Sequence, residues 1–179
     1  MKKTAYVSLC GMLCAAALLL SFIEGLIPTA GLLPPGVKLG LSNVVTMFAA
    51  FSLGFPAALS IALFKAFFAL LTRGALAGLL SLCGGVLSVC ALCGIIKLDK
   101  SRRLSFLFLG ITGSVCHNLG QLSAVMLITS FAAVYYAPIL IISAVAAGSV
   151  TSFILKATWK YMHRLEANVK TVFEKEKVR

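Results

Sequence analysis

The segment GSVCHNLGQLSA, residues 113–124, places three hydrogen-bonding side chains inside a long apolar run. These are His117, Asn118 and Gln121. At about 100° per residue, one helical face carries Gly110, Gly113, Ser114, His117, Gln121 and Ala124, with Asn118 at its edge. An imidazole and two amides can bind a polar ligand, or they can bond neighbouring helices together. Three such groups beside glycines, which leave space, favour the ligand site.

Further polar side chains occur at a similar depth in the apolar segments. Glu24 is the one acidic residue within a predicted span, and Lys65 lies eight residues before Arg73. Glu24 and Lys65 could pair with each other or could reach the membrane surface separately. Lys38 and Asn43 lie at the start of another predicted helix, whose free N–H groups and positive dipole end attract anions. The excess of cations predicts a small polar or anionic ligand, although Lys38 and Arg73 could simply anchor the chain at the interface.

The composition identifies the environment of these residues. Apolar residues make up 60% of the 179-residue chain and charged residues 12%, against about 45–50% and about 25% in soluble domains. The chain is therefore expected to be an integral membrane protein with one domain. The net charge of +11 would suggest nucleic acid for a soluble protein. Here most cations lie at predicted membrane edges, so we expect the lipid bilayer and no nucleic acid as partner.

Six segments are long and apolar enough, or nearly so, to cross the membrane. We predict spans at residues 4–27, 39–55, 56–73, 75–96, 104–131 and 134–156. Lys and Arg gather at the start of the chain and after the fourth and sixth spans, which predicts both termini inside. The expected fold is all-α: residues 1–157 form a six-helix transmembrane domain in a bacterial cytoplasmic membrane, and residues 158–179 form a basic amphipathic cytoplasmic tail.

The six cysteines all lie in apolar runs and are interpreted as packing residues. Cys90 and Cys93 have the spacing of a redox or metal pair, but no second Cys or His pair is near them in the sequence. We therefore expect no metal and no cofactor.

Three motifs resemble a known family. The motifs that carry this resemblance are PPGVKLGLSNVVTMFA, SLCGGVLS and GSVCHNLGQLSA, followed by YYAP. The chain is similar to the family called Gx transporter, also labelled heptaprenyl diphosphate synthase component I. The resemblance covers residues 4–157. This family is related to the S components of energy-coupling factor transporters. Those are six-helix bundles that capture vitamins or similar micronutrients outside the cell. They work with a transmembrane coupling protein and two ATP-binding cassette ATPases.

The resemblance implies functional positions in this chain. It points to Gly36, Lys38, Gly40, Asn43, His117, Asn118 and Gln121 as site residues. It also makes Gly11 and Ala15 similar to the small-residue face by which S components meet the coupling protein.

The synthase label does not fit the chemistry of the sequence. Prenyl chain elongation needs aspartate-rich motifs that hold magnesium and diphosphate, and this chain has a single aspartate, Asp99. It also has no Gly-rich Walker loop for ATP. We therefore expect that the protein is not an enzyme.

The sequence thus predicts a substrate-binding membrane subunit of an importer of the energy-coupling factor type. The predicted site consists of Lys38, Asn43, Lys65, His117, Asn118 and Gln121, and the predicted docking face of Gly11 and Ala15. Two alternatives remain open: an accessory membrane protein of isoprenoid, quinone or flavin-linked electron-transfer metabolism, and a structural subunit without a ligand.

Overall fold

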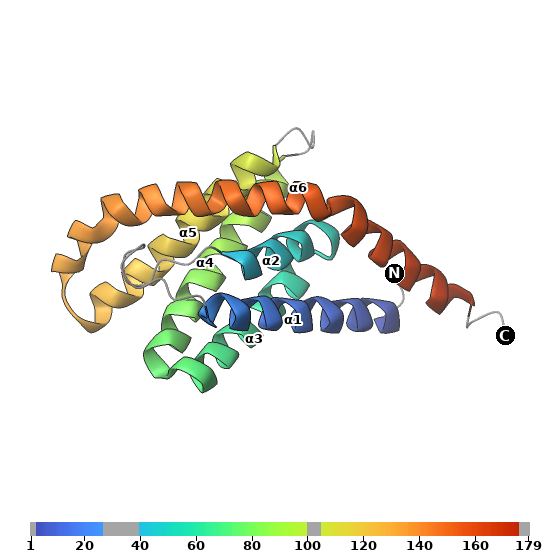
Figure 1. Ribbon diagram of the computed structural model, residues 1–179, viewed down its shortest axis with the longest axis horizontal. Helices are drawn as coiled ribbons and strands as arrows, with labels where there is room; N and C mark the ends of the chain where they lie inside the picture. Colours follow the sequence, from blue (N-terminus) through green and yellow to red (C-terminus); the bar gives the residue numbers. More distant parts are fainter. Residues whose placement is uncertain (1–2, 27–39, 100–104, 176–179) are drawn as a thin grey trace.

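The chain folds into an all-helical bundle (Figure 1). The computed structural model describes residues 3–26, 40–99 and 105–175, with residues 170–175 as backbone only. Its elements are α1 (Lys3–Leu26), α2 (Leu41–Ser52), α3 (Phe55–Arg73), α4 (Ala75–Leu98), α5 (Phe106–Ile128), the 3₁₀ helix η1 (Phe131–Tyr136) and α6 (Ala137–Lys175).

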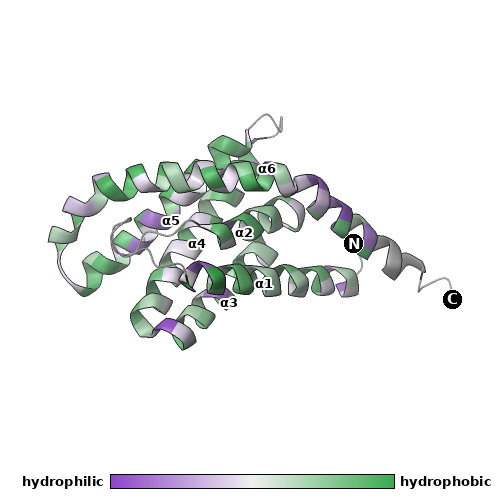
Figure 2. Cartoon of the chain, viewed as in Figure 1, coloured by the Kyte–Doolittle hydropathy of each residue, from purple (hydrophilic) through white to green (hydrophobic). Residues whose placement is uncertain are grey.

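Five helical segments are long and apolar enough to cross a membrane: α1, α3, α4, α5 and the run formed by η1 and α6. Their outer surfaces are apolar as well, and side chains such as Phe64, Leu71 and Phe153 are more than half exposed. Soluble monomers rarely show so much exposed apolar surface. Figure 2 shows this apolar character along most of the helices. These features are those of a multi-pass membrane protein.

The second predicted span, 39–55, is the exception among the six. Its helix, α2, has 12 residues and is about 18 Å long, short of the roughly 30 Å hydrocarbon layer. Every residue from Val44 to Ala50 is buried. The count of six spans and the inside position of both termini remain predictions.

Helix α2 lies at the centre of the bundle (Figure 1). It contacts α1, α3, α4, α5 and α6, and these five helices contact one another in the order α1, α3, α4, α5, α6 and back to α1. Phe48 and Ala49 of α2 are fully enclosed. The short helix is therefore surrounded by long ones and has little contact with the outside.

A tight hairpin at Gly54-Phe55-Pro56 joins α2 to α3. Helix α2 ends at Ser52 and α3 begins at Phe55, with Pro56 in its first turn. Gly54 adopts φ 86°, a left-handed conformation that residues with a side chain rarely adopt. Because α2 and α3 are joined so tightly, Asn43 and Lys65 face each other across them.

Helix α6 continues without a break across the predicted domain boundary at 157/158. Trp159 packs against Phe48, Phe51 and Phe106, with ring centroids 5.4, 5.8 and 5.1 Å away. These aromatic rings join α2, α5 and α6 at the end of the bundle where α1 begins. The start of the predicted tail is thus part of the folded core.

The central position of α2 leads to a prediction about stability. Replacing Phe48 with Ala should lower the free energy of unfolding by about 3–5 kcal/mol, because a large side chain is lost from a closed core. The same substitution at Phe64, which is 57% exposed on α3, should change stability much less. Thermal unfolding in detergent compares the two variants; equal losses would contradict the enclosed position of α2.

Candidate ligand-binding site

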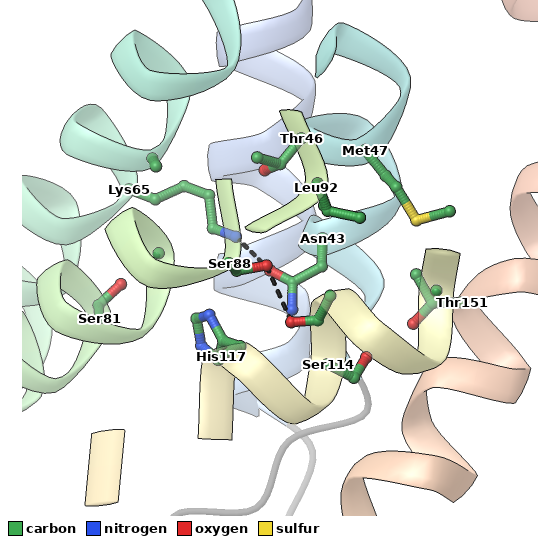
Figure 3. A pocket seen from close by; sticks show the side chains of 14 residues that line it. Asn43, Thr46, Met47, Lys65, Ser81, Ser88, Leu92, Ser114, His117 and Thr151 are labelled. Carbon is green, nitrogen blue, oxygen red and sulfur yellow. Dashed lines mark hydrogen bonds between the residues drawn. The ribbon is translucent and has the colours of Figure 1, made fainter. Parts of the chain in front are cut away.

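Asn43 and Lys65 form the centre of a polar cluster inside the bundle. The Lys65 ammonium donates to Oδ1 of Asn43 at 2.8 Å (Figure 3). Asn43 lies in the first turn of α2 and Lys65 in the middle of α3. Lys65 is only 7% exposed, although it carries a charge among apolar helices. Such a charge needs polar groups as partners, and Asn43 is one of them.

Glu24 closes the cluster near the start of α2. Its carboxylate accepts a hydrogen bond from the backbone N–H of Gly40, the N-cap residue of α2. A carboxylate is favourable there because it meets the positive end of the helix dipole. Gly40 has φ 78°, and a Cβ at this position would lie 3.3 Å from Oγ1 of Thr151. Glycine is therefore favoured both by the backbone conformation and by the space.

His117 and Gln121 contribute the α5 side of the cluster. Nε2 of Gln121 lies 3.3 Å from Nε2 of His117, one helical turn away. An amide nitrogen only donates, so in this arrangement Nε2 of His117 is the acceptor. This bond lies within one helix.

Asn118 behaves differently from the other two polar residues of α5. Its amide nitrogen donates to the backbone carbonyl of Leu140 on α6 at 3.0 Å. This bond joins two helices, as the structural alternative requires. The amide still lines the same cavity as His117 and Gln121. Asn118 thus has a structural contact in addition to its place at the site.

Two small cavities adjoin this cluster. One, of about 30 Å³, is lined by Glu24, Gly40, Arg73, Asn118 and Gln121 among others. The second, of about 20 Å³, extends deeper, towards Thr46 and Ser88. Both are lined by Asn43, Lys65, Ser81, Ser114 and His117. Spaces of this size hold a water molecule or two.

The structure brings most of the predicted site residues together. Asn43, Lys65, His117, Asn118 and Gln121 line one cavity, while Lys38 and Gly36 lie outside the described residues. Glu24 and Arg73, which the sequence analysis noted as nearby charges, line it as well. In the part of the chain that the structure describes, no three His, Cys, Asp or Glu residues group as metal ligands would.

Several site residues were missed by the sequence analysis. Ser81 of α4 and Ser114 of α5 line both cavities. Ser114 is on the predicted polar face, which was the available signal. Ser81 begins the SLCGGVLS motif and Ser88 ends it, so the two serines share one face of α4. Both line the deeper cavity.

The predicted docking residues lie away from this cluster. Gly11 and Ala15 are on an exposed face of α1, and a Cβ at Gly11 would meet nothing within 4 Å. Their small size is therefore not explained by packing among the residues that the structure describes.

Comparison with known families agrees with the motifs. A family model described as "Heptaprenyl diphosphate synthase component I" matches residues 13–158, which include α2 to α5 and the whole polar cluster. The chain belongs to this family. Comparisons with curated proteins and with solved structures returned no match. The cluster around Asn43 and Lys65 thus lies within the part of this chain that matches the family model.

The Asn43–Lys65 contact can be tested by a double-mutant cycle. Asn43→Leu and Lys65→Met should each destabilise the fold, and the double variant should cost less than the sum of the two. The expected coupling is about 1–3 kcal/mol, because a buried hydrogen bond to a charged group is removed. Unfolding in detergent measures it; additive losses would show that the two side chains act independently.

Proposed function

We propose that this chain is the substrate-binding membrane subunit of an energy-coupling-factor-type importer for a small polar or anionic micronutrient. One observation carries the proposal: Asn43, Lys65, His117 and Gln121 come from three helices and line one buried cavity. Ionisable groups are costly in a membrane, and they mark substrate pathways more often than packing. The resemblance to S components supports the same role.

In the proposed mechanism the ligand enters at the end of the bundle where α1 ends and α2 begins. Lys65 and Arg73 line the cavity against the single carboxylate of Glu24, so the positive charges favour an anionic group. His117 and Gln121 then hydrogen-bond the remainder of the ligand. Lys38 is proposed to hold the anionic end with them, and its part in the site remains a prediction.

Ligand entry requires the bundle to open. Ligand pockets commonly measure about 300–1,000 Å³, whereas the two cavities here measure about 20 and 30 Å³. The hydrogen bonds that join α1 to α2 and α2 to α3, from Gly40 to Glu24 and from Lys65 to Asn43, bridge the helices that must separate. We propose that a ligand replaces these internal bonds with its own.

The proposed role is binding without catalysis, in a bacterial cytoplasmic membrane. The energy would come from two ATP-binding cassette ATPases through a transmembrane coupling protein. The exposed small face of Gly11 and Ala15 on α1 supports a docking place for that coupling protein, since small residues let helices approach closely.

The first test removes the polar pair of α5. We expect a small molecule to co-purify with the wild-type protein. The variant His117→Leu, Gln121→Leu should remain folded and lose this molecule, because its hydrogen-bonding partners are gone. Mass spectrometry of gently purified protein measures the bound molecule. Leu119→Ala, at a lipid-facing neighbour on α5, should retain it. Retention of the molecule at full occupancy in the double variant would contradict the site.

A second test concerns the docking face. Gly11→Leu should abolish co-purification with the coupling protein and its ATPases, since a bulky side chain holds the two helices apart. Gly94→Leu is the matched control, because Gly94 is equally exposed and its added Cβ would also meet nothing within 4 Å. Loss of the partners in both variants, or in neither, would count against α1 as the docking helix.

Two other functions have some support. The Asn118–Leu140 bond and the water-sized cavities fit a structural subunit without a ligand. The family description fits an accessory role in isoprenoid metabolism, and a cavity of about 630 Å³ lined by Phe51, Phe106 and Trp159 among others has room for part of a prenyl chain. The same mass spectrometry separates them: a polyprenol supports the accessory role, and an empty protein supports the structural one.

A further inference from the structure

Gly84 of α4 lies directly against the polar pair of α5. A Cβ built on Gly84 would be 2.8 Å from the carbonyl oxygen of His117. It would also be 3.0 Å from Cε1 of the His117 ring and 3.0 Å from Cγ of Gln121. The 2.8 Å contact with the backbone oxygen is shorter than real Cβ atoms make, and the two 3.0 Å contacts with side chains are tighter than nine in ten real ones. A side chain at position 84 would therefore have to displace the His117 ring, the Gln121 side chain, or the α5 backbone.

Other glycines at the helix crossings have a different environment. A Cβ on Gly120 would meet the backbone of Cys83 and Gly84, the nearest atom at 2.6 Å. A Cβ on Gly148 would meet the backbone of Ile111 and Gly110, the nearest atom also at 2.6 Å. These two glycines allow close approach of helix backbones. Gly84 differs because two of its three nearest atoms belong to the side chains that line the cavity.

The neighbouring Gly85 provides an internal comparison. Its added Cβ would lie 3.3 Å from the Cβ of Ala62 on α3, and Gly85 lines the deeper cavity. One residue along α4 the side chain thus points to another helix. Of these two neighbouring positions, only position 84 would place a side chain against His117 and Gln121.

We propose that Gly84 is a positioning residue of the site. By leaving the space between α4 and α5 empty, it allows the His117 ring and the Gln121 amide to lie in their 3.3 Å contact at the cavity wall. The inference rests on the proposed function for the ligand-binding role of this pair. The positioning itself is a property of the ligand-free protein and is tested without a ligand.

The test follows the two histidines of the chain by NMR in protein labelled with ¹⁵N-histidine. His163 stacks near Trp159 at the other end of the bundle and serves as the internal reference. In Gly84→Ala, the ring nitrogen signals of His117 should shift and those of His163 should not. In Gly85→Ala, the His117 signals should stay in place. Unchanged His117 signals in Gly84→Ala, or an equal shift in Gly85→Ala, would overturn the inference.

A second variant covers the case in which Gly84→Ala does not fold. The substitution is then made in the His117→Ala, Gln121→Ala background, where the two crowded side chains are truncated. Recovery of folded, monodisperse protein supports the inference, because the side chains were the obstacle. Failure to recover it would show that the α5 backbone is the obstacle, and Gly84 would be an ordinary packing residue.

The outcome also separates this inference from the proposed function. If the His117 signals shift in Gly84→Ala and the co-purified molecule is still bound, then Gly84 positions the pair but the pair does not bind the ligand. If His117 keeps its signals while His117→Leu, Gln121→Leu loses the molecule, the pair is a ligand site that Gly84 does not position.

Discussion

The burial of a short helix at the centre of the bundle is the constraint on which the rest of the structure depends. Helix α2 is enclosed by five long helices, and Gly40 and Ser42 at its start are buried. An unsatisfied N–H in such a place costs several kcal/mol. The carboxylate of Glu24 accepts from the N–H of Gly40 and so satisfies one of these groups. Beside it, the side chain of Asn43 accepts from the buried Lys65 ammonium. The polar cluster thus combines the satisfaction of a helix end with the pairing of a buried charge.

The same bonds bear on the proposed ligand binding. The bonds from Gly40 to Glu24 and from Lys65 to Asn43 join different helices, and in the proposed mechanism they are exchanged for bonds to a ligand when those helices separate. On the α5 side, the bond between His117 and Gln121 lies within one helix, so its exchange does not by itself separate two helices. The side chain of Asn118 donates to the carbonyl of Leu140 on α6. If this bond were exchanged for one to a ligand, α5 would lose a contact with α6.

Much of the fold and part of the site could be predicted from the sequence. Apolar runs, the Gly54–Pro56 hairpin and the polar face of α5 are local patterns, so the helices and the shared face of His117 and Gln121 follow from them. The shortness and central burial of α2 could not be predicted, because its apolar sequence is the same whether it faces lipid or protein. Gly84 was missed for a similar reason: His117 and Gln121 lie 33 and 37 positions away in the chain and are brought close only by the packing of α4 on α5.

The most direct measurement is an experimental structure of the gently purified protein in a lipid nanodisc, with its co-purified molecule bound. The account predicts density for a small molecule in contact with Asn43, Lys65 and His117, in a cavity enlarged well beyond the present water-sized spaces. Density for water alone between these three side chains, with the co-purified molecule bound elsewhere or absent, would contradict it.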